Sequence, residues 1–314
     1  MRPDARRWYE RRTSAAADWP VIALQRAKGT STVSVVLPAL DEEATVGAVV
    51  RCVRALADST GLVDEVVVVD SGSADGTAAA AAAAGARVAY AATVLPALGD
   101  RPGKGEVLWK SLAATGGDIV AFLDADLESV QPHYVTGLLG PLLTDPHVAL
   151  VKGFYERPLA GATEAAGGRV TELVARPLLN LVFPALAGVV QPLSGEYAGR
   201  RSLLERLPFV SGYGVETGLL LDTLTLAGLD AIAQVDLGLR RHAHQDHLAL
   251  GRMAAEIIQV VLARAGSDLA LSTALTQFRR GCSGDFEPVT ADVVLTERPP
   301  IETVPAYADR ARAS

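Results

Sequence analysis

The chain has 314 residues, of which 49% are hydrophobic and 21% are charged, and its formal net charge is −7. These values are typical of a globular protein with one large or two small domains. The acidic balance argues against a nucleic-acid surface, although it leaves room for a local basic pocket that binds a small anion. Cys52 and Cys282 form no disulfide framework and have no metal-binding spacing, which favours a reducing cytoplasm. The N-terminus has no continuous apolar run, so we expect neither a signal peptide nor a membrane anchor.

Two β-loop-α units are predicted first. Val33–Pro38 is apolar and predicts a buried strand, and Asp41–Val53 predicts a helix whose acidic first residues suit its positive end. Val63–Asp70 predicts a second strand. Ser71–Thr77 is a turn with N-cap residues, and it leads into an alanine-rich helix around residues 78–84.

A third strand is predicted at Arg87–Tyr90, a third helix at Gly103–Ala114 and a fourth strand at Ile119–Leu123. Strands that alternate with helices of this length predict an α/β fold with a doubly wound, mostly parallel sheet. Asp124 and Asp126 follow the fourth strand on the same side, where they can hold a hard cation such as Mg²⁺ or Mn²⁺. The pair predicts a site for a cation-bound diphosphate, although an isolated Asp-x-Asp also occurs in surface turns.

Sheets of this kind bind ligands outside the carboxyl ends of their strands. Pro38–Glu42, Asp70–Gly72 and Asp124–Asp126 all fall at that edge. In order and spacing, Val36–Glu43, Val69–Thr77 and the Asp124–Asp126 motif resemble the nucleotide-sugar half of a GT-A glycosyltransferase, a Rossmann-like fold.

The resemblance extends beyond that half to the segments Arg101–Glu106, Gly167–Pro177, Gln191–Tyr197 and Gly212–Glu216. Together these segments resemble the actinobacterial glucosyl-3-phosphoglycerate synthases and the related mannosyl-3-phosphoglycerate synthases, over roughly residues 30–280. The resemblance implies a cytoplasmic, retaining enzyme that depends on Mg²⁺ or Mn²⁺. Such an enzyme transfers a hexose, most simply glucose from UDP-glucose, to 3-phosphoglycerate and forms glucosyl-3-phosphoglycerate. GDP-mannose remains the alternative donor.

For the donor nucleotide, the resemblance implies contacts from the loops after the first two strands, from a lysine and from the first aspartate. These residues are Pro38, Ala39, Leu40, Glu42, Ser71, Gly72, Lys104 and Asp124. Glu42 could instead serve the positive end of the following helix. Lys104 stands between two glycines and suits a diphosphate as a mobile point charge, but it could also be a solvated surface lysine.

For the metal, the resemblance assigns Asp126 and a distant histidine, His242, to coordination and Asp124 mainly to ribose or outer-shell contact. A zinc cluster of His242, His244 and His247 lacks the ligand that would complete a tetrahedral set. His244 and His247 could also be solvated loop residues. The resemblance makes His244 a substrate contact, but the glucosyl enzymes carry Asn there, which leaves the acceptor contacts and the sugar open.

Gly167–Thr171 begins a predicted helix and is the expected acceptor site. Free backbone N–H groups at Gly168, the guanidinium of Arg169 and the hydroxyl of Thr171 are suited to a phosphate or carboxylate. The same residues could be no more than a helix start that is capped locally by Thr171 and Glu172.

The remaining site residues are implied near the sugar. Ser194 would bring a backbone segment to the hexose, Tyr213 would shape the pocket, and Glu216 would hold hexose hydroxyl groups. Glu216 could instead be an acidic residue at a helix start. With Arg169, Ser194 and Glu216 are the catalytic candidates.

We expect four parts: an N-terminal extension (1–30), a nucleotide-sugar-binding half (31–150), an acceptor-binding half (151–282) and an extended arm or partly disordered tail (283–314). The apolar stretch Pro177–Val190 is too short to span a membrane and predicts a core element or the surface of a homodimer.

Two alternatives from other classes remain. A polyprenyl-phosphate glycosyltransferase shares the N-terminal motifs, but this chain has no clear spanning or basic amphipathic segment for a membrane. A non-catalytic nucleotide-sugar-binding protein would keep the fold without the chemistry. The joint presence of Lys104, Asp126, Arg169 and His242 argues against it.

Overall fold

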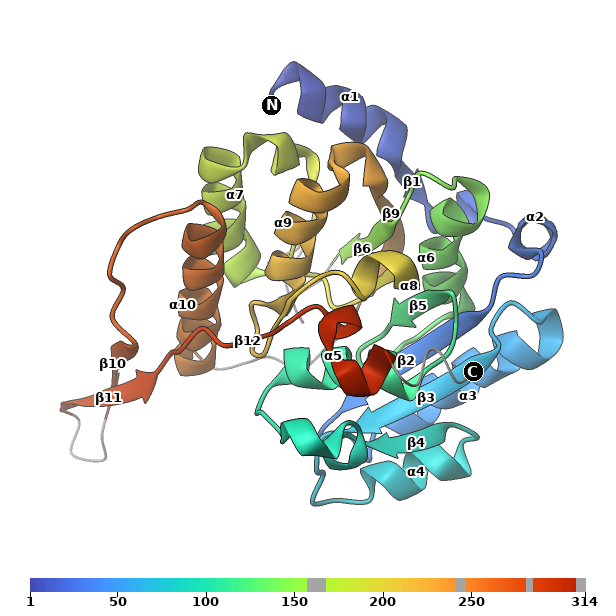
Figure 1. The fold of residues 1–314 in the computed structure, drawn as a ribbon, viewed down its shortest axis with the longest axis horizontal. Helices are drawn as coiled ribbons and strands as arrows, with labels where there is room; N and C mark the ends of the chain where they lie inside the picture. Colours follow the sequence, from blue (N-terminus) through green and yellow to red (C-terminus); the bar gives the residue numbers. More distant parts are fainter. Residues whose placement is uncertain (157–167, 241–246, 281–284, 309–314) are drawn as a thin grey trace.

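The computed structural model describes residues 1–156, 168–240, 247–280 and 285–308. Across these ranges its centre is an eight-stranded sheet in which β7 runs antiparallel to both of its neighbours and the other pairs are parallel (Figure 1). The predicted α/β fold with a mostly parallel sheet is confirmed. In sheet order the strands are β1 (Thr13–Ala15), β9 (Ile232–Leu239), β6 (Leu150–Glu156), β7 (Tyr197–Arg200), β5 (Ile119–Phe122), β2 (Val33–Ala39), β3 (Glu65–Asp70) and β4 (Arg87–Tyr90).

Helices cover both faces of the sheet because strand residues alternate between two apolar cores. In β3, Val66 and Val68 enter one core, and Val67 and Val69 enter the other. The α-helices are α1 (Pro3–Arg12), α2 (Val21–Lys28), α3 (Val46–Thr60), α4 (Thr77–Ala83), α5 (Lys104–Ala114), α6 (Pro132–Thr144), α7 (Arg176–Val182), α8 (Arg201–Leu204), α9 (Val215–Ala227) and α10 (His247–Arg264). Helices α3 and α6 pack in the core of Val66, and α5 and α9 pack in the core of Val67, as a doubly wound sheet requires.

Shorter helical turns connect these elements. They are η1 (Ala16–Asp18), η2 (Ala91–Thr93), η3 (Pro96–Leu98), the π-helical turn η4 (Thr171–Ala175), η5 (Pro184–Gly188), η6 (Leu229–Ala231) and η7 (Ile301–Thr303).

The helix after β2 begins at Val46 and not at Asp41, so its predicted start is wrong. Asp41 has a φ of 56°, and its N–H donates to Ser73 Oγ at 3.0 Å. The N–H of Glu42 donates to Thr77 Oγ1 at 2.7 Å. These bonds tie the loop after β2 to the turn after β3. The backbone N–H groups of Asp41 and Glu42 are therefore bonded to that turn and not within a helix. Glu42 therefore lies at the carboxyl edge of the sheet.

The first thirty residues, expected as an extension, belong to the body of the protein. Strand β1 joins the sheet beside β9, and Trp8 of α1 is buried with its indole N–H donating to the Ile232 carbonyl at 2.9 Å. A single tryptophan among arginines gives no periodic signal, which is why the sequence did not reveal this packing.

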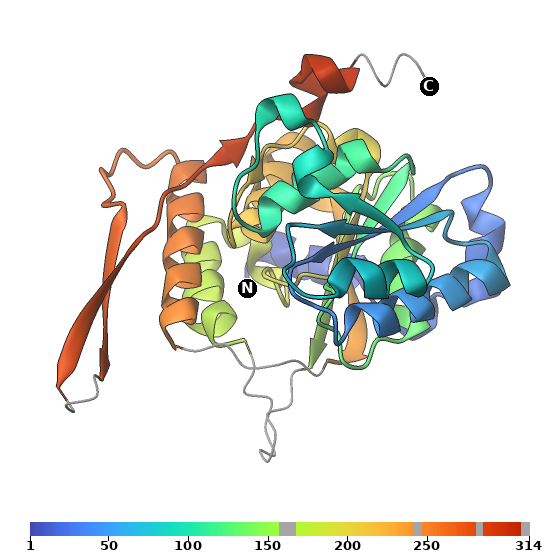
Figure 2. The same cartoon turned by 90° about the horizontal axis from the view of Figure 1, so that it is seen from below.

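The C-terminal residues form an arm and then return to the core. Strands β10 (Ala274–Arg280) and β11 (Phe286–Asp292) pair as a ribbon that points away from the body (Figures 1 and 2), and β12 (Glu297–Arg298) pairs with β8 (Phe209–Val210). Beyond the arm, Ile301, Val304 and Tyr307 are buried. The expectation of a partly disordered tail is therefore wrong for residues 293–308, because these apolar residues are too widely spaced to show a pattern but still reach the core.

The apolar stretch Pro177–Val190 divides between core and surface. Leu179 and Leu186 are buried, whereas Leu181 is 82% exposed. No helix in the described ranges is long and apolar enough to cross a membrane.

Candidate active site

A cleft of about 580 Å³ opens at the carboxyl ends of β2, β3 and β5, the edge that the sequence predicts. Nine predicted residues line it: Pro38, Ala39, Leu40, Glu42, Ser71, Lys104, Asp124, Asp126 and Tyr213. Pro102, Gly103 and Gly212 of the wall belong to two of the segments that carry the resemblance. The sequence did not single out its other parts, which include Val210, Ser211, Glu256 and residues 292–296.

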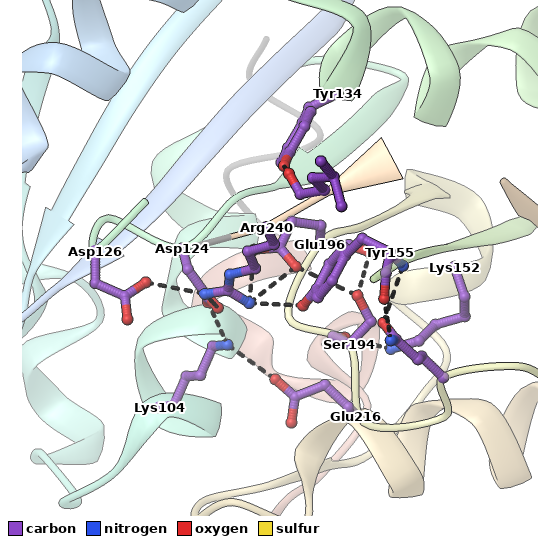
Figure 3. A network of polar contacts seen from close by, with 12 residues as sticks. Lys104, Asp124, Asp126, Tyr134, Lys152, Tyr155, Ser194, Glu196, Glu216 and Arg240 are labelled. Carbon is purple, nitrogen blue, oxygen red and sulfur yellow. Dashed lines mark hydrogen bonds and ion pairs between the residues drawn. The ribbon is translucent and has the colours of Figure 1, made fainter. Parts of the chain in front are cut away.

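Four predicted side chains meet in a chain of ion pairs at this cleft, and three of them, Lys104, Asp124 and Asp126, line it (Figure 3). Lys104 Nζ lies 2.6 Å from Asp124 Oδ1 and 2.9 Å from Glu216 Oε1. Arg240 Nη2 lies 2.9 Å from Asp124 Oδ2 and 3.0 Å from Asp126 Oδ1. Two cations therefore alternate with three carboxylates, and Glu216, although it lies in the first turn of α9, reaches the Lys104 ammonium.

The two aspartates have different electrostatic environments. Burial alone would raise the pKa of Asp124, but Lys104 and Arg240 hold that pKa well below its usual range. Burial and the neighbouring Asp124 charge raise the pKa of Asp126. A further cation at this pair would favour the ionised form of Asp126. Gly195 makes room for the arrangement, because a Cβ there would lie 2.4 Å from Asp124 Oδ2.

The donor set fits a hard divalent cation. The Asp126 side chain is 44% exposed, and within the described residues only its Oδ1 is bonded, to Arg240. Free carboxylate oxygen beside a second carboxylate is what Mg²⁺ or Mn²⁺ binds, with phosphate oxygens filling other positions. Within the described ranges, no group of three or more acidic, histidine or cysteine side chains is arranged so that it could hold a metal ion. The predicted ligand His242 and the predicted substrate contact His244 lie outside those ranges, and His247 is the first residue of α10.

A buried layer that the sequence did not predict supports the acidic pair. Arg240 is 4% exposed, and its Nη1 donates to Tyr155 Oη at 2.6 Å and to Glu196 Oε2 at 3.2 Å. The Ser194 hydroxyl donates to the same Glu196 oxygen at 3.3 Å. The signal available in the sequence was that Arg240 comes directly after β9. A sequence does not show which acidic side chains such a buried cation contacts.

Lys152 of β6 holds Ser194 from the other side. Its buried Nζ donates to the Ser194 carbonyl at 2.6 Å and lies 4.7 Å from the centroid of the Tyr197 ring. Ser194 is thus fixed at its backbone by Lys152 and at its hydroxyl by Glu196 (Figure 3). Burial lowers the pKa of Lys152 to about 8.

This depressed pKa predicts a pH-dependent contribution to stability. Between about pH 8 and the ordinary lysine value of 10.5, the unfolded chain retains a proton that the folded chain has lost, so the free energy of unfolding rises with pH. We expect the wild type to gain stability relative to Lys152→Met across that window and to gain nothing below it. Urea unfolding of both proteins at pH 7, 9 and 10.5 measures the difference. A constant difference over the whole range would contradict the shift.

The other predicted residues do not line the cleft in the described structure. Gly72 has a φ of 100°, and its N–H donates to Asp70 Oδ1, so it shapes the turn after β3. Arg169 is exposed, and Thr171 is buried at the start of η4. Gly168 has a φ of 85° and accepts the N–H of Glu172 at 2.9 Å, as at a helix start. A role for this segment at an acceptor site stays a prediction.

The chain is similar in sequence and structure to known proteins of one family. Residues 34–207 match the family model for glycosyl transferase family 2. The chain is 52% identical over 302 residues to the glucosyl-3-phosphoglycerate synthase of Mycolicibacterium smegmatis, an alignment that covers 95% of this chain and 98% of the relative.

Two crystal structures of glucosyl-3-phosphoglycerate synthase from Mycobacterium tuberculosis are each 50% identical to this chain. One, in complex with Mn²⁺, UDP-glucose and phosphoglyceric acid, has a TM-score of 0.81 and covers 90% of this chain and 95% of its own. The other, in complex with Mg²⁺ and UDP, has a TM-score of 0.84 and covers 93% and 98%. The chain therefore belongs to glycosyl transferase family 2 and, within it, to the family of glucosyl-3-phosphoglycerate synthases.

Proposed function

We propose that this protein transfers glucose from UDP-glucose to the hydroxyl group of 3-phosphoglycerate, with retention at the anomeric carbon, to give glucosyl-3-phosphoglycerate and UDP. The observation that carries the proposal is the chain of ion pairs at the cleft, in which Lys104 and Arg240 join Asp124, Asp126 and Glu216. The family membership supports it, since a relative with 50% sequence identity has been crystallised in complex with UDP-glucose and phosphoglyceric acid.

The donor half of the cleft can hold UDP. Pro38, Ala39, Leu40 and Ser71 line the part of the cleft that we assign to the base and ribose, and Lys104 offers a point charge to the diphosphate. Asp126 and His242 are the proposed ligands of the cation. Asp126 is the second aspartate of the Asp-x-Asp motif, so the motif contributes one ligand. A bound Mg²⁺ or Mn²⁺ would neutralise the negative charge that develops on the departing UDP.

The remaining predicted site residues are assigned to the hexose and to the acceptor. Glu216 keeps one carboxylate oxygen for hexose hydroxyl groups while Lys104 holds the other. Tyr213 contributes to the cleft wall. Ser194, whose carbonyl accepts from Lys152, is the residue we propose to bring a backbone segment toward the hexose. Arg169, with the backbone at Gly168, Thr171 and the side chain of His244, is the proposed 3-phosphoglycerate site, because a guanidinium at a helix start suits a phosphate.

The proposal includes location and assembly. We place the activity in the cytoplasm, independent of membrane and nucleic acid, in keeping with the net charge of −7. We place the enzyme in a homodimer. Leu181 of helix α7 is 82% exposed, and Leu173 of the preceding turn η4 is 75% exposed, which supports a partner surface at and just before the predicted Pro177–Val190 region.

A donor panel tests the function. The purified protein is incubated with Mn²⁺, 3-phosphoglycerate and either UDP-glucose or GDP-mannose, and the product is identified by mass spectrometry and by the anomeric coupling in its NMR spectrum. We expect glucosyl-3-phosphoglycerate with the anomeric configuration of the donor. Faster transfer from GDP-mannose would favour the mannosyl alternative. Transfer only to polyprenyl phosphate in vesicles would favour the membrane alternative.

A further inference from the structure

The C-terminal segment forms part of the active cleft, although it is far in sequence from the nucleotide-sugar half. Residues 292–296 line the same cleft as the donor loops after β2 and β3. Strand β12 then pairs with β8, and the N–H of Ser211 donates to the Thr296 carbonyl at 2.9 Å. In both views this segment lies against α5, the helix that begins with Lys104 (Figures 1 and 2).

Arg298 of β12 makes the closest attachment between this segment and α5. It is 5% exposed, and its Nε and Nη2 donate to the two carboxylate oxygens of Glu106, each at 2.7 Å. Its guanidinium also lies 5.2 Å from the centroid of the Trp109 ring. Glu106 is fully buried in the first turn of α5, two residues after Lys104, so the paired forks fix the beginning of the helix.

The same guanidinium also holds the chain before Lys104. Its Nη1 and Nη2 donate to the carbonyls of Leu98 and Gly99 at 3.1 and 3.2 Å. The turn that follows has little space, because a Cβ at Gly105 would lie 1.7 Å from the Val210 carbonyl oxygen. Arg298 therefore binds both the segment that enters the Lys104 turn and the helix that leaves it.

We propose that Arg298 is a positioning residue for Lys104 and thereby for the diphosphate of the donor. Without Arg298, the buried Glu106 carboxylate would keep only Lys110 Nζ, at 3.5 Å, as its ion-pair partner among the described residues. A buried carboxylate that loses both of its guanidinium donors is stabilised by moving toward water. Glu106 would move in this way, and the first turn of α5 would move with it. This inference rests on the proposed function, in which Lys104 contacts the donor.

The experiment is a double-mutant cycle on UDP affinity, measured by calorimetry with UDP and MnCl₂. It uses wild type, Lys104→Met, Arg298→Met and the double variant. We expect each single change to raise the Kd for UDP about tenfold, because Lys104→Met removes the charge-assisted contact of Lys104 to the diphosphate and Arg298→Met displaces Lys104 from it. The double variant should bind UDP no more weakly than Lys104→Met alone, because Arg298 acts through Lys104.

Arg201→Met is the matched control, since Arg201 donates to the Leu112 carbonyl and to Thr115 Oγ1 at the other end of α5. It should lower the Tm and leave the Kd for UDP unchanged. If Arg298→Met does not fold, Arg298→Lys replaces it; this variant keeps the charge without the fork and should raise the Kd to an intermediate value.

Each outcome decides. Wild-type affinity in a folded Arg298 variant, or losses that multiply in the double variant, would overturn the positioning role. An equal loss of affinity in Arg201→Met would also overturn it, because any loosening of α5 would then be enough to weaken UDP binding. If the wild type does not bind UDP with MnCl₂, the proposed function fails first, and the inference falls with it.

Discussion

Replacing Asp126 with alanine is expected to lower turnover at least about a hundredfold while the protein stays folded. Asp126 offers the more exposed carboxylate of the pair, and within the described residues its one bond is to Arg240. Its loss removes a cation ligand, so the departing UDP would carry its negative charge without full neutralisation. The measurement is kcat at saturating UDP-glucose, 3-phosphoglycerate and Mn²⁺.

Asp126→Asn separates charge from shape in this experiment. The amide keeps an oxygen for Arg240 but gives the cation a weaker ligand, so we expect both variants to lose Mn²⁺ affinity in the presence of UDP, measured by electron paramagnetic resonance. Near-UV circular dichroism should be unchanged. Full activity of Asp126→Ala, or full wild-type activity in EDTA, would show that the carboxylate pair holds no catalytic cation.

Replacing Arg169 with alanine is expected to weaken binding of the acceptor and to spare the donor. Loss of a charge-assisted, bidentate contact is worth about 1.5–3 kcal/mol, so the KM for 3-phosphoglycerate should rise roughly ten- to a hundredfold. Arg169 is exposed, so stability should hardly change. Two saturation curves test this, one in 3-phosphoglycerate at saturating UDP-glucose and one with the roles reversed.

Arg176→Ala is the matched control on the same stretch of chain. Its guanidinium already donates to Glu172 at 2.7 Å and to the Val190 carbonyl at 2.6 Å, so its loss should affect stability more than the acceptor curve. If Arg169→Ala shifts the donor curve and leaves the acceptor curve in place, the acceptor binds elsewhere. Residues 168–171 would then be only a helix start.

Local sequence patterns predicted much of the fold and the donor side of the site. Val66–Val69 could be recognised as a buried strand because two-sided burial needs an unbroken apolar run, and alternation then sends its side chains into two cores. Asp124 and Asp126 were predictable at this edge because parallel strands bring their carboxyl ends together, whereas Lys104, at the start of α5, was expected there from the family resemblance. The start of α3 at Val46 was not predictable, since it depends on bonds to the turn after β3.

The tertiary structure alone decided which charges meet. Arg240 contacts Asp124 and Asp126 from more than a hundred residues away, and Arg298 contacts Glu106 across a separation of 192 residues. In a sequence each of these is one more charged residue, and most charged residues are solvated. A buried charge is stable only beside a partner that replaces its water, and the chain supplies that partner through its path in space and not through spacing in sequence.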